Sequence, residues 1–184
     1  GPALSGDTVA DSRERVLPAL EAAAKQAREC GVRLALEPMR AGLGSSLVNS
    51  PDEAIALLDE VGARDAGIAF DTWHLWDLPD IAAQIERNGP RIFNVQISDY
   101  RPPRTFADRF LPGDGQIDWS DLLANLIRVG YQGYFDLEVF SDDGRWGVEL
   151  PDALYKSDIA EWTGRGRKQF FELYTDAVRA VRSA

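Results

Sequence analysis

Four apolar stretches of the sequence end in a residue whose side chain carries a metal-binding oxygen atom. The stretches and these residues are 32–37 with Glu37, 67–71 with Asp71, 91–96 with Gln96 and 134–138 with Glu138. Side chains alternate between the faces of a strand, so each stretch has an apolar face that a helix can cover and a second face with the polar residue. If the strands are parallel, the oxygen donors meet at their carboxyl ends. Such a set predicts a site for a divalent cation.

The segments around these strands have the patterns of helices. We expect helices over about 8–30, 50–62, 80–87, 118–129 and 166–182. The first pattern ends at Gly31, and the second begins with the capping sequence Ser50-Pro-Asp-Glu53. Pro18 lies inside the first pattern, so a kink or a break is expected there. Strands that alternate with helices through short connections predict βα units and a parallel sheet.

Two α/β architectures fit this order of elements. In an open doubly wound sheet the central strands are buried on both faces and read as continuous apolar runs. These strands alternate instead, which favours a barrel with a polar mouth. A (β/α)8 barrel usually needs about 250 residues, whereas this chain of 184 residues has four such strands. We therefore predict about half a barrel, with the site near the loops 99–117 and 141–161 that follow strand ends.

Composition limits the classes of partner. The 184 residues are 45% hydrophobic, enough for one well-buried core, and we expect a single domain over 1–184. The net charge of −10 argues against nucleic acid or an anionic membrane as a partner. The one cysteine, Cys30, cannot form an internal disulfide, and neither a bilayer-spanning run nor a basic leader is evident, so we expect a cytoplasmic protein. Gly1-Pro2 is consistent either with a remnant of protease cleavage or with native sequence.

Five motifs, taken together, resemble the xylose-isomerase-like superfamily of sugar and sugar-phosphate isomerases, epimerases and related dehydratases. They are Ala35-Leu-Glu-Pro38, Phe70-Asp-Thr-Trp-His74, Val95-Gln-Ile-Ser-Asp99, Leu111-Pro-Gly-Asp-Gly-Gln-Ile-Asp118 and Gly130-Tyr-Gln-Gly-Tyr-Phe-Asp-Leu-Glu138. The resemblance implies a (β/α)8 TIM barrel of which this chain is the C-terminal half, about the last four βα units. Half a barrel would expose strand edges and apolar surface, so we expect a homo-oligomer, a missing N-terminal half or poor solubility.

The resemblance also implies one divalent metal ion held by Glu37, Asp71, Gln96 and Glu138. Gln96 departs from the family, in which most members have histidine at this position. A shell made only of oxygen atoms favours Mn²⁺, Mg²⁺ or Co²⁺ over Zn²⁺. Some dehydratases that resemble this superfamily have glutamine here. The alternative is that Gln96 only forms hydrogen bonds in the lumen and the metal site is degenerate.

Two carboxylates beside such an ion suggest proton transfer. A metal ion polarises the carbonyl of a hydroxy-ketone and acidifies the adjacent C–H. Glu37 and Glu138 could then remove a proton and return it on the other face or on the next carbon. His74 is the only histidine and lies three residues after Asp71. The resemblance suggests that it contacts a substrate hydroxyl or relays a proton, and the alternative is a structural hydrogen bond.

Two arginines and two tryptophans are further candidates for substrate binding. Arg101 and Arg109 lie in the loop after Gln96 and could bind a phosphate or carboxylate group, or be ordinary solvated arginines. Trp73, together with Trp76, could form the wall of a sugar pocket or pack against the absent half of the barrel.

Three functions follow from these candidates. The first is a metal-dependent isomerase or epimerase of a sugar or sugar phosphate, acting through an enediolate. The second keeps the fold and the metal ion but eliminates water from a polyol-like substrate, as in a 3-dehydroshikimate or inosose dehydratase. The third is a non-catalytic half-barrel fragment or binding module. An apurinic-site endonuclease of the same fold is disfavoured by the acidic charge and the single histidine.

Overall fold

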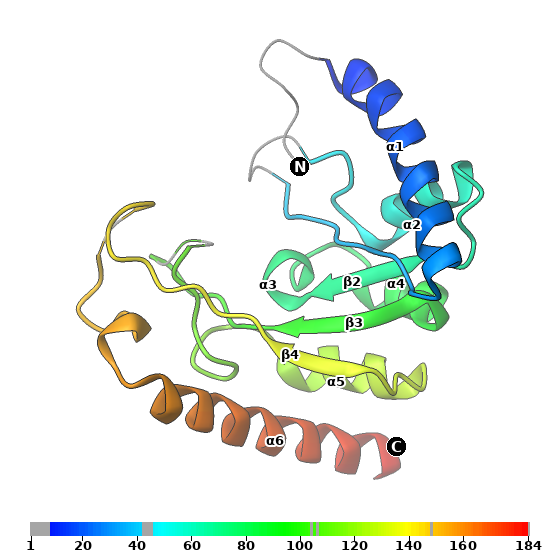
Figure 1. Ribbon diagram of the computed structural model, residues 1–184. Coiled ribbons are helices and arrows are strands. Elements are labelled where there is room, and N and C mark those ends of the chain that lie inside the picture. Colours follow the sequence, from blue (N-terminus) through cyan, green and yellow to red (C-terminus); the bar gives the residue numbers. More distant parts are fainter. Residues whose placement is uncertain (1–7, 42–45, 104, 106, 148, 184) are drawn as a thin grey trace.

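The computed structural model describes residues 8–41, 46–103, 105, 107–147 and 149–183, so the pair Gly1-Pro2 lies outside the described residues. Its centre is a sheet of four parallel strands in the order β1-β2-β3-β4 (Figure 1). The strands are β1 Ala35–Leu36, β2 Gly67–Asp71, β3 Ile92–Ile97 and β4 Tyr134–Leu137. Figure 1 shows that β2 and β3 point to the same side, where the loops that follow β3 and β4 also lie. The predicted α/β order and parallel pairing are confirmed.

Helices flank the strands, and several ends follow the predicted capping chemistry. The α-helices are α1 Val9–Cys30, α2 Pro51–Glu60, α3 Thr72–Leu75, α4 Ile81–Asn88, α5 Trp119–Arg128 and α6 Ile159–Ser183, with 3₁₀ turns η1 Gly89–Arg91 and η2 Leu154–Lys156. Thr8 and Asp11 form a capping box at the start of α1, and Gly31 ends it with a φ of 67°. Ser50 accepts the N–H of Glu53 at the start of α2.

Three boundaries differ from the sequence-based expectations. Helix α1 runs without a break through Pro18, because good helix formers on both sides offset the lost hydrogen bond. Strand β1 has two residues rather than six, since it pairs only with β2 at one edge of the sheet. Helix α6 begins at Ile159 rather than 166, because Asp158 accepts the N–H groups of two residues in its first turn.

Gly166 is therefore not a helix start but a packing residue inside α6. A Cβ atom there would lie 3.0 Å from Leu111 Cδ2 and 3.0 Å from Leu137 Cδ2. The absence of a side chain lets α6 approach β4 and the loop before α5.

The hydrophobic core lies between the sheet and helices α2, α4, α5 and α6. On the sheet side it contains Ile68, Phe70 and Val95, which are fully buried. These belong to the predicted apolar faces of β2 and β3. The opposite face of β4 is open, with Tyr134 83% exposed and Asp136 exposed. None of the helices within the described ranges is long and apolar enough to cross a membrane.

Candidate metal and acid–base site

The strand register places the four predicted metal ligands at the same end of the sheet. Asp71 is the Cα partner of Gln96, and Gln96 is the partner of Asp136, two residues before Glu138. The N–H of Glu138 donates to the carbonyl of Ile97 at 3.1 Å, so the pairing of β3 and β4 continues to this residue. Glu37 directly follows β1. The parallel sheet thus produces the convergence that the sequence pattern predicted.

Asp71 is the centre of the site and is completely buried. Its Oδ1 accepts the N–H of Trp73 at 2.9 Å and so caps the short helix α3. Its Oδ2 accepts Nη1 of Arg109 at 2.8 Å and lies 3.5 Å from Nε2 of His74. One oxygen therefore holds the backbone, and the other faces the functional groups.

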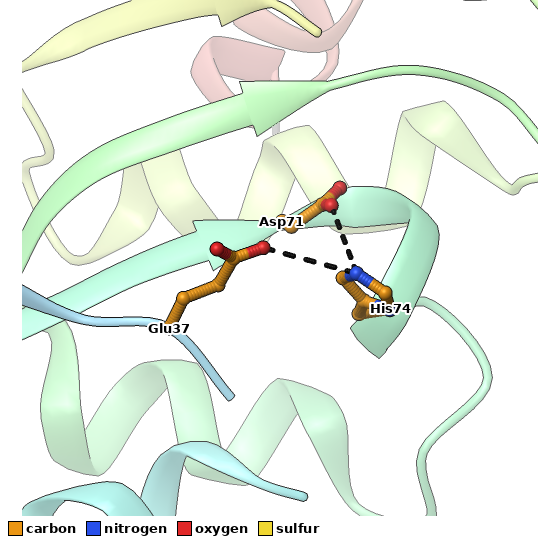
Figure 2. Close-up of side chains that lie close together, drawn as sticks. All are labelled: Glu37, Asp71 and His74. Carbon is orange, nitrogen blue, oxygen red and sulfur yellow. Dashed lines mark ion pairs between the residues drawn. The ribbon is translucent and has the colours of Figure 1, made fainter. Parts of the chain in front are cut away.

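His74 brings Glu37 and Asp71 together. Figure 2 shows both carboxylates directed at the same ring nitrogen, Nε2, with Oε1 of Glu37 at 3.8 Å and Oδ2 of Asp71 at 3.5 Å. One ligand atom from each of these three residues lies within 4.8 Å of the others, close enough to share a cation. The other ring nitrogen, Nδ1, accepts the main-chain N–H of Arg40 at 3.2 Å.

Arg109 supplies positive charge to this group of acids. Its side chain is 3% exposed, and Nη1 lies 2.8 Å from Asp71, 3.2 Å from Oγ of Ser98 and 3.5 Å from Oε2 of Glu138. Its guanidinium also lies 5.1 Å from the ring centre of Trp73 and 4.8 Å from that of Phe140. The alternative of a solvated loop arginine is therefore wrong for this residue.

Asp99 positions the loop that carries Arg109, and the sequence reading did not single it out. Its main chain exchanges two hydrogen bonds with Phe110, of 2.8 and 3.2 Å, and its carboxylate accepts the indole N–H of Trp119 at 2.7 Å. A Cβ atom at Gly115 would lie 2.1 Å from Oδ1 of Asp99. The sequence carried little signal for this role, because the Pro-Gly-x-Gly turn at 112–115 that Asp99 contacts lies well beyond it along the chain.

Gln96 supplies a carbonyl oxygen that suits a cation. Its Oε1 is buried and has no hydrogen-bond partner among the described residues. A buried acceptor without a partner costs about 1–3 kcal/mol, so such an atom needs a ligand of some kind. Because Gln96 is adjacent to Asp71 in the sheet, this oxygen could join the carboxylates of Glu37 and Asp71 in binding a hard divalent ion.

The two outer glutamates bind protons more readily than usual. Burial raises the pKa of Glu37 to about 7, and the negative charges of Asp71 and Glu138 add to the effect. Burial and the charge of Asp71 likewise raise the pKa of Glu138. Burial lowers the pKa of His74 to about 4, although the charge of Asp71 opposes this shift. Without a cation, the site therefore contains a neutral imidazole and two easily protonated carboxylates.

The remaining candidates lie around this group. Trp73 is buried and packs edge-on against His74, with ring centres 5.2 Å apart. Trp76 is partly buried and stacks at a tilt near Tyr100. Arg101 is exposed, lies 4.6 Å above the ring of Phe110 and does not join the acidic group. It does line, with Arg109, a pocket of about 440 Å³ beside the loop after β3.

The comparison with protein families decides the fold family. The model of the xylose isomerase-like TIM barrel matches residues 1–165. The chain belongs to this family. The resemblance read from five motifs is confirmed, and so is the (β/α)8-type fold, of which the chain supplies about the last four βα units.

Known relatives include epimerases and dehydratases. The chain is 29% identical over 133 residues to a D-psicose 3-epimerase of Enterocloster bolteae, a match that covers 72% of this chain and 42% of the epimerase. It is 30% identical over 131 residues to a 3-dehydroshikimate dehydratase of Pseudomonas aeruginosa, covering 66% of this chain and 20% of that enzyme. A crystal structure of a protein from Sinorhizobium meliloti 1021 has a TM-score of 0.81 and 27% identity, covering 94% of this chain and 62% of that one. The chain therefore spans half or less of the curated relatives that it matches.

Proposed function

We propose that this chain carries the metal and acid–base site of a divalent-metal-dependent isomerase or epimerase acting on a sugar or sugar phosphate. The main support is the pair Glu37 and Glu138, two carboxylates with raised pKa values that lie on the outer strands on either side of Asp71. Isomerisation and epimerisation at a carbon beside a carbonyl both need one group to take a proton and one to return it.

In this proposal Glu37, Asp71, Gln96 and Glu138 hold the cation. The buried, unpartnered Oε1 of Gln96 supports its place in this set. A bound divalent ion would polarise a substrate carbonyl and acidify the neighbouring C–H. An all-oxygen donor set favours Mn²⁺, Mg²⁺ or Co²⁺.

Glu37 and Glu138 exchange the proton in this proposal. Without a cation the pKa of Glu37 is raised to about 7 and that of Glu138 is raised as well, so each carboxyl group can take up and return a proton more readily than an ordinary glutamate. Their side chains are 37% and 29% exposed, so a substrate can approach both. His74 donates a hydrogen bond to a substrate hydroxyl, and Trp73 behind it limits the pocket.

Arg109 and Arg101 bind an anionic part of the substrate, such as a phosphate or carboxylate. Arg109 reaches both the acidic group and the pocket of about 440 Å³, which Arg101 also lines. A guanidinium presents paired N–H donors that match either anion.

A dehydratase is the second candidate, and Gln96 is the observation that favours it. The sequence relatives include a 3-dehydroshikimate dehydratase, and Gln96 replaces the histidine that the family resemblance implies at this position. A dehydratase would use the same base to remove a proton and Glu138, His74 or Arg109 to assist the departure of hydroxide. Only this reaction produces a new enone, whose ultraviolet absorbance separates the two candidates.

The open polar face of β4 suggests that the working site needs more chain. The side chains of Tyr134 and Asp136 are exposed on the face that would line a barrel lumen. We therefore propose that a second subunit or an N-terminal half completes the pocket. A chain that binds neither metal nor sugar would instead support the reading as a non-catalytic module.

Calorimetric titration with Mn²⁺ tests the proposal first. We expect one ion per site in the wild type and loss of binding in Glu138→Gln, whereas Asp136→Asn, on the same face of β4, keeps it. Mass measurement in the same buffer gives the oligomeric state. Ketoses and ketose phosphates are then screened for deuterium exchange at the carbon beside the carbonyl. A folded wild type without metal binding, or an equal loss in Asp136→Asn, contradicts the proposed site.

A further inference from the structure

The pocket of about 440 Å³ beside the acidic group contains both arginines and aspartates. Arg109 borders the pocket and the acidic group alike, since it also donates to Asp71 at 2.8 Å. A substrate that reacts at the acidic group can therefore extend into the pocket. The described residues that line it include five charged ones, from the loops after β3 and β4 and from α6, which are Arg101, Arg109, Asp114, Asp152 and Arg165.

We propose that this pocket binds a carboxylate group of the substrate, with Arg101 and Arg165 as its main partners. The substrate class is then a keto-sugar acid, and not a neutral sugar or a sugar phosphate. The inference rests on the proposed function for the reacting end of the substrate. It goes further by naming the chemical group at the other end and a residue of α6 that recognises it.

Arg101 is held in place by an aromatic ring and not by an acid. Its guanidinium lies 4.6 Å from the ring centre of Phe110, a cation–π contact that restricts its orientation. Within the described part of the chain, no carboxylate forms an ion pair with Arg101, and its side chain is exposed. The N–H donors of the guanidinium are therefore available to a ligand. Two parallel donors of this kind match the two oxygens of a carboxylate.

Asp114 positions the second arginine, Arg165, at the border of the pocket. Oδ2 of Asp114 accepts Nη2 of Arg165 at 3.3 Å, and Oδ1 accepts the side-chain amide of Gln169 at 2.6 Å. Helix α6 thus engages both oxygens of Asp114. The side chain of Arg165 remains 54% exposed and uses one nitrogen in this contact, so its other N–H groups can donate to a ligand.

The charge of the pocket fits one negative charge better than two. Three arginines and two aspartates line it, and Arg109 shares its charge with Asp71, so the surplus is at most one positive charge. A carboxylate matches this surplus. A phosphate dianion would bring a second negative charge close to Asp114 and Asp152, and like charges in such proximity repel.

The structure around the pocket also favours a carboxylate over a phosphate. Phosphate sites at this end of a barrel use main-chain N–H groups of loops and helix starts. The start of α6 is already occupied, because Asp158 accepts the N–H groups of Ala160 and Glu161. Leu111 and Leu154, which are 1% and 7% exposed, form an apolar part of the lining that suits the carbon skeleton of a sugar acid.

Three ketoses that differ only at C6 test which group the pocket prefers. D-fructuronate has a carboxylate there, D-fructose 6-phosphate a phosphate and D-fructose a hydroxyl group. Calorimetry measures their binding with Mn²⁺ and again with EDTA, and we expect D-fructuronate to bind about tenfold more tightly than the other two. Equal affinity for all three, or binding of none by the folded chain, overturns the inference. A preference for D-fructose 6-phosphate overturns the choice of a carboxylate.

Variants of the two arginines test their roles. Arg101→Gln and Arg165→Gln should each reduce the preference for D-fructuronate to less than about threefold. Arg145→Gln is the matched control, because Arg145 is an exposed arginine of the loop after β4 that pairs with Asp143 at 3.2 Å and does not line the pocket. Arg165→Lys, which keeps the charge, replaces Arg165→Gln if circular dichroism shows unfolding. A wild-type preference in the variants of either position overturns the role of that arginine.

The same titrations separate this inference from the proposed function. A preference for D-fructuronate in EDTA, in a chain that binds no Mn²⁺, would support the carboxylate pocket and contradict the proposed function. Binding of Mn²⁺ that is lost in Glu138→Gln, without any preference for D-fructuronate, would support the proposed metal site and contradict the carboxylate pocket.

Discussion

The central and outer strands of the sheet end in acids of different character. Asp71 on β2 is completely buried and bound on both oxygens, to the N–H of Trp73 and to Arg109. Glu37 after β1 and Glu138 after β4 remain 37% and 29% exposed and have raised pKa values. The difference indicates a division of work in which the buried central acid holds its neighbours in place, and the outer acids can change their protonation.

The largest effect is expected at the central acid. Asp71→Asn keeps the shape and the oxygen that accepts the N–H of Trp73, but it leaves the buried guanidinium of Arg109 without its 2.8 Å partner. Removing one member of a buried ion pair destabilises a protein by about 3–5 kcal/mol. Urea unfolding without metal measures this loss.

Asp136→Asn is the matched control for that prediction. Its side chain is exposed on β4, so the same chemical change should alter the free energy of unfolding by less than about 0.5 kcal/mol. If Asp71→Asn and Asp136→Asn lost equal free energy of unfolding, Asp71 would contribute no more to stability than an exposed acid does.

Replacing Arg109 tests the same buried ion pair with Asp71 by removing its positive partner. Arg109→Met removes the positive charge that lies 2.8 Å from Asp71, so the metal-free chain should be destabilised. A divalent ion no longer has to share the acids with a guanidinium, and its affinity should rise about tenfold, or ~1.4 kcal/mol. Calorimetry with Mg²⁺ and thermal unfolding with and without Mg²⁺ measure both effects. Weaker metal binding in the variant would mean that Arg109 orients the ligands instead.

The sequence predicted which acids lie at the strand ends, but not which of them are buried and paired and which are exposed. Alternation of apolar and polar residues was enough to place Asp71 and Gln96 side by side at strand ends, because side-chain direction follows from strand geometry. Arg109 could not be placed, since it depends on the path of a loop held by Asp99. The contact between Arg40 and His74 involves a main-chain N–H, and a main-chain group has no signature in the sequence.

The predicted helices also differ from the observed ones where tertiary packing, rather than the local sequence pattern, decides the structure. Gly166 was predicted to start the last helix. In the structure it lies inside α6, where the absence of a side chain allows close packing against Leu137. Helix α3, four residues long, was not expected because its apolar pattern is too short to show a period. It nevertheless carries His74 and so matters to the site.

A pH dependence of metal binding follows from Glu37, the acid directly after β1. The pKa of Glu37 is about 7 without a cation, mainly because of burial. A cation needs the ionised form, so binding near neutral pH should release a proton, and affinity should fall as pH drops below about 7. Calorimetry in buffers of different ionisation enthalpy measures the released proton.

The variant Glu37→Gln tests the source of this proton. In the metal-free chain the raised pKa also means that stability contributed by protonated Glu37 is complete below pH 4.5 and is lost as pH rises through about 7. In Glu37→Gln, which cannot ionise at this position, the stability of the metal-free chain should no longer fall as pH rises through about 7. Unchanged proton release in the variant would assign the proton to another group.

Among the acids of the proposed site, the smallest effect on stability is expected at Glu138, although we expect its replacement to abolish metal binding. Oε2 of Glu138 lies 3.5 Å from Nη1 of Arg109, a longer contact than that of Asp71, and the side chain is 29% exposed. Ion pairs of this kind contribute about 0–1 kcal/mol. The raised pKa shows that the ionised form is unfavourable where it stands, which offsets even this gain. Glu138→Gln should therefore unfold within about 1 kcal/mol of the wild type in urea without metal. A loss as large as that of Asp71→Asn would mean that Glu138 is structural, and the division between central and outer acids would not hold.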